Sequence, residues 1–246
     1  MPIKRFKSIL RALHLNDNTQ QPQPGHPDFD KLYKLLPLLN LLGNNFQTNA
    51  KNSSSQSVDE SMILFKGRST LKQYMPLKPI KRGYKVWCRC DSQSGYLYEF
   101  EIYTGKTCQG TETGLGAKVV KNLTGKLMEE EFEKHVTFDN FFTDTALLQY
   151  LHDNGLFATG TVRRNRADLP TMIKNTKNLK LAKGKFKWKT KKDVAFTVWQ
   201  DTKEVLILST AFHPKINNTH VTRTQKDGSK KLIKPWLFNN TRREWG

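Results

Sequence analysis

The sequence predicts an α/β protein: a mixed β-sheet covered by helices, with a helical segment before it and a basic, β-rich region after it. Three observations support this prediction. Segments of alternating apolar and polar residues are interleaved with helical periodicity in the middle of the chain. Leucines at helical spacing dominate the first part of the chain. The last third holds most of the excess positive charge and several short β-prone segments.

The first segment, residues 4–46, has a helical pattern, with an apolar face formed by Phe6, Ile9, Leu10 and Leu13. In the second half of this segment, Gly43 is the expected C-terminal cap of a leucine-rich helix. Pro37 is expected to kink or split that helix. The polar residues 44–57 then predict a linker.

The middle of the chain predicts three consecutive strands, followed by strands that are joined through helices. The turn sequence DSQSG makes a hairpin of the second and third strands. The order β-β-β-α-β-α-β is that of a ribonuclease H-like core with a mixed sheet. The predicted elements are strands 57–64, 84–90 and 96–103, helix 114–127, strand 134–141, helix 143–155 and strand 156–162.

The last region, from residue 166 onward, predicts a small, basic β-domain. Residues 185–210 read as short strands, and in the sequence KFKWK the two aromatic residues fall on one face and the lysines on the other. The predicted domains are therefore a helical segment with its linker (1–55), the sheet and helices (56–165), and a basic β-rich insertion domain (166–246).

Charge is distributed unevenly along the chain, whose formal net charge is +19. Residues 163–246 hold 21 basic and 6 acidic side chains, whereas residues 56–162 hold 13 of each. This excess predicts a polyanionic partner, nucleic acid first and an acidic membrane surface second. No segment approaches the roughly 18 apolar residues that span a bilayer. Only 3 cysteines are present, which favours a reduced setting over a disulfide framework.

Two acidic residues in β-prone segments point to metal chemistry. Asp59 lies in the first strand, and Asp139 ends the fourth, which is its neighbour in the predicted topology. Neighbouring strands lie about 4.8 Å apart, so carboxylates at matching heights can share a hard cation such as Mg²⁺. Two such ions support phosphodiester displacement. The alternative is a pair of ordinary acids, solvated or capped at strand ends.

Several motifs make the chain resemble the piggyBac family of transposases, including the transposase-derived proteins of animal genomes. The resemblance covers nearly the whole chain and includes the LHLNDN of the opening helix. Its strongest motifs are VDESMILFKGRS (58–69), RGYKVWCRCDSQSGYLYEFEIYTGK (82–106), GLGAKVVKNL (114–123), VTFDNFFT (136–143), LLQYLHDNGLFATGTVRRNR (147–166) and LPTMIK (169–174).

The resemblance implies a ribonuclease H-like catalytic core with three aspartates that bind Mg²⁺ or Mn²⁺. Two carry over by motif, as Asp59 and Asp139. The family's third aspartate follows a proline and a Tyr-Asn pair, inside a Gly-Gly-Val-Asp motif. Here Pro235 is followed by WLFNNTRREWG, in which only Phe238-Asn239 echoes that pair. Asp227 is the nearest acid but lacks the motif. The family's cysteine-rich zinc-binding tail is also missing, so we expect a C-terminally truncated or decayed copy.

Basic residues near these motifs are candidates for contacts to the DNA backbone. A merely solvated basic surface is the alternative for each group, and the resemblance to the family's insertion domain favours DNA for the last one. The candidates are Lys66 and Arg68 after the first strand, Arg163, Arg164 and Arg166 after the last core strand, and Lys183, Lys185, Lys187 and Lys189.

The sequence leaves two main functions open. One is a metal-dependent DNA transposase in the nucleus, which would cut and join DNA at TTAA targets and could act as a homodimer. The other is a transposase-derived DNA- or protein-binding module without catalytic activity. An inactive fragment is a third reading. Because the third aspartate is missing, we expect weak or absent strand cleavage by the chain alone.

Overall fold

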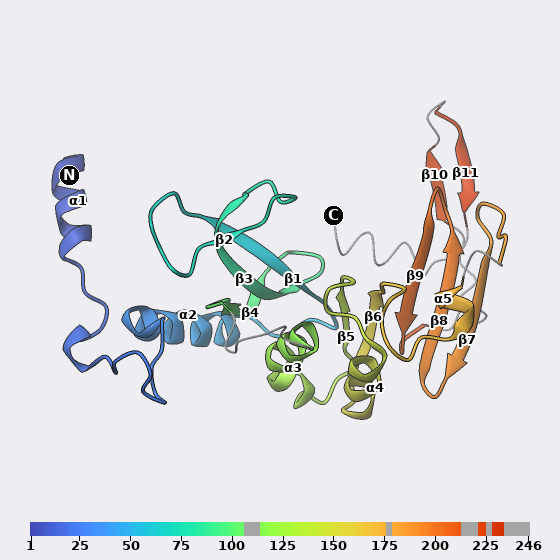
Figure 1. The fold of residues 1–246 in the computed structure, drawn as a ribbon, viewed down its shortest axis with the longest axis horizontal. Coiled ribbons are helices and arrows are strands. Elements are labelled where there is room, and N and C mark those ends of the chain that lie inside the picture. Colours follow the sequence, from blue (N-terminus) through green and yellow to red (C-terminus); the bar gives the residue numbers. More distant parts are fainter. Residues whose placement is uncertain (106–113, 176–178, 213–220, 225–227, 234–246) are drawn as a thin grey trace.

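The computed structural model describes residues 1–105, 114–175, 179–212, 221–224 and 228–233, with the backbone alone for 221–224 and 230–233. Figure 1 shows an elongated molecule with a sheet along its length and the N-terminal helix at one end. The strands are β1 (Ser55–Leu64), β2 (Gln73–Tyr74), β3 (Arg82–Asp91), β4 (Leu97–Ile102), β5 (His135–Phe138), β6 (Phe157–Thr161), β7 (Phe186–Lys191), β8 (Val194–Gln200), β9 (Glu204–Ser209), β10 (Val221–Thr224) and β11 (Lys230–Ile233).

The main sheet has nine strands in the order β2-β3-β1-β5-β6-β9-β8-β7, and β4 pairs with β3 beside this path. β1, β5 and β6 are parallel, and their neighbours are antiparallel. This mixed α/β sheet is the fold class that the sequence predicts. The helices are α1 (Ile3–Ala12), α2 (Leu36–Thr48), α3 (Leu115–Met128), α4 (Thr145–Asp153) and α5 (Thr171–Lys174), with 3-10 turns at Asn18–Gln20 and Tyr33–Leu35.

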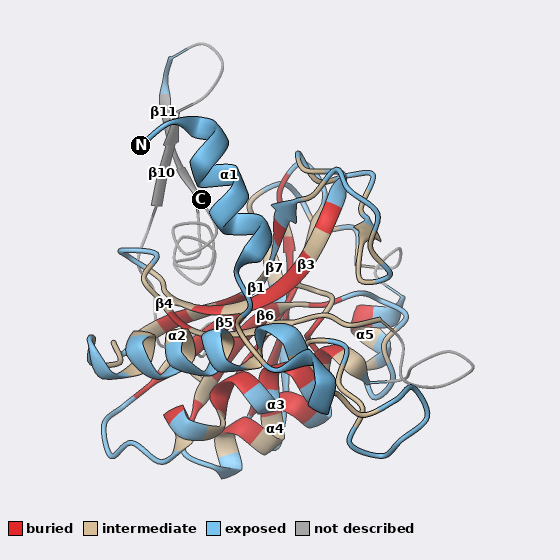
Figure 2. Cartoon of the chain, turned by 90° about the vertical axis from the view of Figure 1, so that its left-hand side faces the viewer, coloured by how far each residue is buried: buried red, intermediate tan, exposed pale blue. Residues whose placement is uncertain are grey.

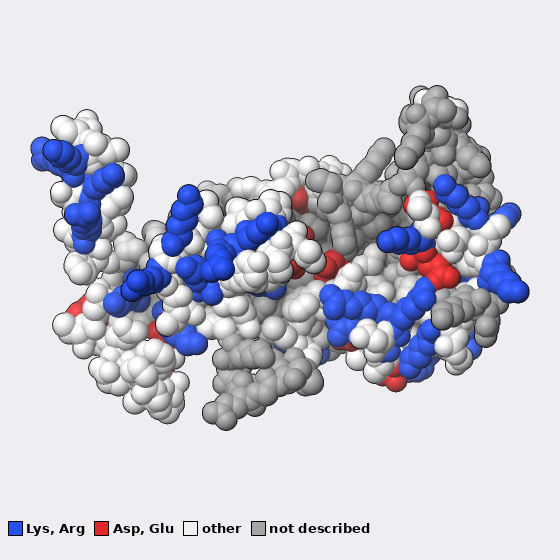
Figure 3. Space-filling model, turned by 45° about the horizontal axis from the view of Figure 1, so that its top comes forward, with Lys and Arg blue, Asp and Glu red and all other residues white. Residues whose placement is uncertain are grey.

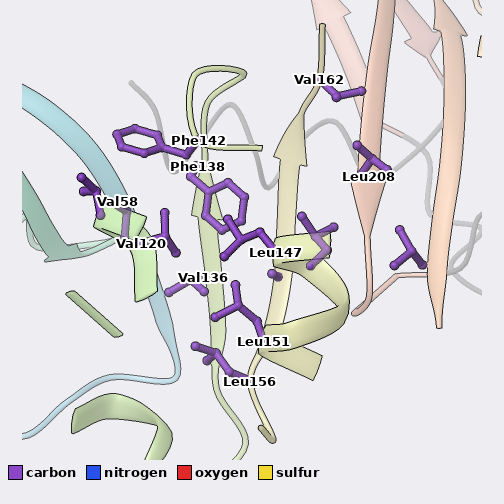
Figure 4. Close-up of a cluster of buried hydrophobic side chains, with 14 of the residues drawn as sticks. Val58, Val120, Val136, Phe138, Phe142, Leu147, Leu151, Leu156, Val162 and Leu208 are labelled. Carbon is purple, nitrogen blue, oxygen red and sulfur yellow. The ribbon is translucent and has the colours of Figure 1, made fainter. Parts of the chain in front are cut away.

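The core lies between one face of the sheet and helices α3 and α4. Figure 2 shows the buried residues along the strands and on the helix faces turned toward them. Side chains from the strands and from both helices meet in one cluster, drawn in Figure 4, which includes Val58, Phe138, Leu147 and Leu208. No helix among the described residues combines the length and the apolar character needed to cross a membrane.

The N-terminal segment differs from the prediction in two ways. Pro37 lies in the first turn of α2 and does not kink it, because the fixed φ of proline suits that position and its missing N–H has no partner there. The expected cap at Gly43 is also wrong, since α2 continues to Thr48. The predicted linker, 44–57, therefore contains the end of α2 and the start of β1.

The middle elements appear close to where the sequence predicts them, but β5 is shorter than the expected strand 134–141 and the short β2 was not predicted. The hairpin of β3 and β4 turns at Asp91, whose carboxylate accepts hydrogen bonds from the N–H groups of Gln93 and Ser94. Asp144 caps α4 by accepting from the N–H of Leu147, and Gly155 follows the helix with φ +73°. These local signals fix where each element begins and ends.

The basic β-strands after residue 166 continue the main sheet. β9 pairs with β6 antiparallel, and β8 and β7 follow it to the edge. Phe186 and Trp188 are partly buried and alternate with exposed lysines, as predicted. One face of β8 and β9 contributes Phe196 and Leu208 to the main core. The division of the chain into domains at residue 166 stays a prediction.

Candidate metal and DNA site

Asp59 and Asp139 come together where the parallel pairing of two neighbouring strands stops: Asp59 lies in the middle of β1 (Ser55–Leu64), and Asp139 directly follows β5 (His135–Phe138). β1 and β5 are parallel, and Val58 is the register partner of Phe138. Asp59 and Asp139 each follow one of these partners, so they are at matching heights. Because side chains alternate along a strand, Asp59 lies on the face opposite the buried Val58. The predicted neighbouring strands are confirmed, although β5 ends one residue before Asp139.

The surroundings of Asp59 and Asp139 disfavour the negatively charged form of both carboxyl groups. Burial is the largest cause that raises the pKa of both the Asp59 and the Asp139 carboxyls, and the nearby charge of Glu60 raises both further. The charge of Asp139 also raises the pKa of Asp59. A divalent cation between the carboxylates would relieve this cost.

The loop after β5 fixes the Asp139 side chain. The backbone N–H of Phe141 donates to Asp139 Oδ1 at 2.8 Å. The Thr143 hydroxyl donates to the Asp139 carbonyl oxygen at 2.7 Å. Helix α3 packs closely behind the loop at Gly116, where a Cβ atom would lie 2.5 Å from the Phe141 carbonyl oxygen. Asp59 Oδ1 accepts from the Glu60 N–H at 2.7 Å. The two carboxylates are therefore held by their own backbone.

Charged side chains surround the pair. Lys78 Nζ lies 3.1 Å from Glu60 Oε1, and this carboxylate side chain is 10% exposed. Lys85 is buried on β3. Arg163 Nε donates to Asn140 Oδ1 at 2.6 Å, directly after Asp139. Burial still raises the Asp139 pKa, and the Phe141 N–H and the charge of Arg163 offset only part of that rise.

The donor set fits a hard divalent cation. Asp59 and Asp139 offer carboxylate oxygens from adjacent strands, and Mg²⁺ is commonly bound by one or two carboxylates with water and phosphate oxygens in the remaining positions. The positive side chains nearby suit phosphate groups that would complete the coordination.

The predicted basic residues are exposed except Arg166, which is partly buried. Lys66 and Arg68 are exposed in the segment after β1, and Lys187 and Lys189 are exposed on the edge strand β7. Lys183 and Lys185 are exposed in the segment before β7. Figure 3 shows Lys and Arg gathered in groups on one face, with acidic side chains between them.

The arginines after β6 have structural partners. Arg164 forms an ion pair with Glu204 of β9. Arg166 Nη2 donates to the carbonyl oxygens of Asn140 and Phe141, at 3.3 and 2.6 Å. These arginines hold the Asp139 loop and the neighbouring strand, a role that the sequence pattern did not reveal.

The third acidic ligand is not located. Asp227, Pro235 and the Phe238-Asn239 pair lie outside the described residues. His135 lies on β5 and serves the packing: its Nε2 is 2.9 Å from Thr159 Oγ1, and its ring packs on Phe212.

A second group of possible metal ligands was missed. The ligand atoms of His152, Asp153 and Asp193 lie within 4.8 Å of one another. No sequence spacing could reveal this group, because β7 and β8 bring Asp193 to α4 only in the folded chain. The Gln149 amide donates to both carboxylates, at 2.8 and 2.9 Å, and so already satisfies them as a hydrogen-bonded cluster.

A mixed sheet with parallel central strands, two helices on one face and paired aspartates at a strand end is the arrangement of a ribonuclease H-like catalytic region. The comparison with known proteins agrees. A family model described as "Transposase IS4" matches residues 1–240. The chain belongs to this transposase family, and within it to the piggyBac transposase-derived proteins.

Two human relatives are similar over most of the chain. The chain is 33% identical over 216 residues to human "PiggyBac transposable element-derived protein 3", covering 85% of this chain and 35% of that protein. It is 34% identical over 213 residues to human "PiggyBac transposable element-derived protein 2", covering 84% and 35%. The chain thus spans about a third of the length of these relatives.

A solved structure shares the fold. The chain superposes on a protein of the "piggyBac transposase synaptic complex with hairpin DNA" with a TM-score of 0.79 and 24% identity. The match covers 99% of this chain and 49% of that one.

Proposed function

We propose that the chain carries the first part of a piggyBac-type catalytic region that acts on DNA phosphodiesters. The observation that supports this most directly is the parallel register of β1 and β5, in which Asp59 and Asp139 each directly follow one of the paired residues Val58 and Phe138. The family of the chain supports the same conclusion, as do the basic side chains around the site. Mg²⁺ or Mn²⁺ is the proposed cation and DNA the proposed partner.

Each group near the site has a role in this proposal. A bound divalent cation would polarise the phosphate and activate the attacking oxygen. Asp59 and Asp139 would hold it through one carboxylate each, and the backbone of Glu60 and Phe141 keeps these carboxylates oriented. Arg163 and the exposed lysines would hold the DNA backbone nearby. Target joining at TTAA follows from the family resemblance alone.

The sequence holds no Gly-Val-Asp motif, so the site proposed here has two of the three carboxylates that the family resemblance implies. Two carboxylates bind a cation more weakly than three and position it less well, so we expect weak or absent strand cleavage by this chain alone. The alternative is a transposase-derived DNA-binding protein without catalysis. Appending a family C-terminus that contains the third aspartate would separate the two, since only the first predicts a gain in DNA nicking.

Cation binding tests the site itself. Mn²⁺ titrated into the chain, followed by its electron paramagnetic resonance signal, should show a saturable site. Asp59→Asn and Asp139→Asn should each weaken it by about tenfold or more, because each removes one of the two carboxylate ligands. Glu131→Gln is the matched control, since Glu131 is exposed and precedes β5 at the other end of that strand. Unchanged Mn²⁺ affinity in both asparagine variants would refute the site.

Assembly and location complete the proposal. We propose a homodimer and a nuclear location, because the proposed substrate is chromosomal DNA and two transposon ends must be handled together. Sedimentation of the chain with and without DNA would test the first, and fluorescence imaging of the tagged chain in cells would test the second.

A further inference from the structure

Lys85 is a buried cation that the proposed function leaves unexplained. Its residue exposure is 8%, on β3 at the position opposite Met62 of β1. Lysines are seldom buried to this degree unless they are paired. Among the described residues, no carboxylate forms an ion pair with it. Its ammonium instead lies over two aromatic rings, 4.8 Å from the centroid of Phe141 and 5.5 Å from that of Trp87.

Phe141 connects this lysine to the proposed metal site. Its backbone N–H donates to Asp139 Oδ1 at 2.8 Å, so the position of Phe141 sets the direction of that carboxylate. Its carbonyl oxygen accepts from Arg166 and packs on Gly116. The remaining part of the residue, the ring, is in contact with Lys85. The residue that orients Asp139 is thus held at its ring, its carbonyl group and its N–H.

We propose that Lys85 is a positioning residue for the metal site, acting through the Phe141 ring on the Asp139 carboxylate. A cation–π contact is stronger when the cation is desolvated, as this one is. It ties the loop after β5 to β3, two strands away in the sheet. The inference rests on the proposed function, because it assumes that Asp139 holds a cation.

A purely electrostatic role for Lys85 predicts the opposite result. The charges of Glu60, Asp139 and Asp59 all act on Lys85, so its positive charge lies within reach of the site. If Lys85 contributed only this charge, it would repel a divalent cation, and removing it would strengthen cation binding. If Lys85 positions Asp139, removing it weakens cation binding. The sign of the change separates the two roles.

The test is Mn²⁺ affinity in variants that keep the side-chain volume. Lys85→Met should weaken Mn²⁺ binding by about tenfold, the lower end of the range for residues that support metal ligands. Lys85→Arg keeps a cation that stacks on aromatic rings and should stay within about twofold of the parent chain. Lys81→Met removes the same charge from an exposed position just before β3 and should cause no loss. Tighter or unchanged binding in Lys85→Met would overturn the proposal.

A double-mutant cycle tests the path through the ring. Phe141→Leu keeps Lys85 but removes the ring, and it should weaken Mn²⁺ binding about as much as Lys85→Met does. The double variant should be little worse than either single one, because both changes break the same contact. If the loss of Mn²⁺ affinity in the double variant equals the product of the two single losses, the proposed path through the ring is contradicted. If Lys85→Met does not fold, Phe141→Leu still decides, since unchanged affinity there overturns the proposal.

Failure of this inference can be told apart from failure of the proposed function. If Asp59→Asn and Asp139→Asn leave Mn²⁺ binding unchanged, both the positioning role and the proposed function are refuted. Binding that depends on these aspartates but not on Lys85 or Phe141 would refute the positioning role alone.

Discussion

Gly116 and Gly125 lie on the same helix, α3, but in very different surroundings. A Cβ atom at position 116 would lie 2.5 Å from the carbonyl oxygen of Phe141, whereas nothing lies within 4 Å of a Cβ atom at position 125. The first glycine therefore permits close packing of the helix on the Asp139 loop. The second has no such role, and it lowers helix propensity without any packing gain.

Alanine at these two positions should have opposite effects. Gly116→Ala should lower the free energy of unfolding by about 1 to 3 kcal/mol, because the loop has to move away from the new methyl group. Gly125→Ala should raise it by about 0.5 to 1 kcal/mol. Urea denaturation of both variants measures this. Equal changes in unfolding free energy for the two variants would show that α3 does not pack tightly on the Asp139 loop.

His135 should make stability depend on pH. Burial lowers the pKa of His135 to about 4, and an unfolded histidine titrates near 6.5. Between these values the unfolded chain binds the proton and the folded chain does not, so stability falls as pH drops from about 6.5 to 4. The loss from this group approaches about 3 kcal/mol.

The pH effect is measured as a difference between variants, because other groups titrate in the same range. His135→Gln should show a shallower loss of unfolding free energy between pH 7 and pH 4 than the parent chain. His14→Gln changes an exposed histidine and should leave the parent profile unaltered. A parallel profile for His135→Gln would mean that His135 is not held neutral.

Among the elements, a buried arginine joins β3 to its neighbours. Arg89 is 1% exposed and donates to Glu99 of β4 at 2.8 Å and to the Leu123 carbonyl oxygen of α3 at 2.6 Å. Its Nη1 also donates to Asn52 and Gln56, at the start of β1. One side chain thus satisfies polar groups of two strands, a helix and a connecting segment.

Removing this arginine should be costly. Arg89→Met leaves Glu99 and Gln56 without their buried partner, so we expect a loss of about 3 to 5 kcal/mol in unfolding free energy. Arg82→Met, on the same strand but exposed, should cost less than about 1 kcal/mol. Thermal or chemical denaturation distinguishes them. A small effect at position 89 would show that the network contributes little.

The elements also show what the sequence can and cannot predict. Strands and helices with local signals, such as the Asp144 cap and the Asp91 turn, were predicted well because their causes lie within a few residues. Pro37 was misjudged, since the same proline breaks a helix interior but begins a helix when it falls in the first turn. The pairing of β9 with β6 was not predicted, because the periodicity of a strand does not determine which other strand it pairs with.

The candidate site was partly predictable for the same reason. The order of strands predicted that the strands of Asp59 and Asp139 are neighbours, and the motifs of the family resemblance selected these two acids from the others. The supporting contacts of Lys85 with Phe141, and of Arg166 with the loop, depend on tertiary packing that no spacing reveals.

For the whole molecule, the net charge of +19 should make DNA binding sensitive to salt. Replacing Lys187 and Lys189 on β7 by glutamine should reduce the slope of log affinity against log salt by about 2, if both contact phosphates. Filter-binding titrations on duplex DNA measure this slope. The double variant Lys51→Gln and Lys126→Gln removes the same amount of charge at positions outside β7. It should leave the salt slope of DNA binding nearly unchanged. Equal slopes in both double variants would mean that β7 is not a DNA contact.

β1 and β5 are side by side in the sheet but about eighty residues apart in the chain, whereas β1 and β3 are much closer in sequence. During synthesis, β1, β3 and β4 can pair before β5 has been made. At that stage the edge of β1 that later pairs with β5 is unpaired. The two carboxylates therefore cannot hold a cation together before β5 has been made. Until then, the open edge of β1 is free to pair with other strands.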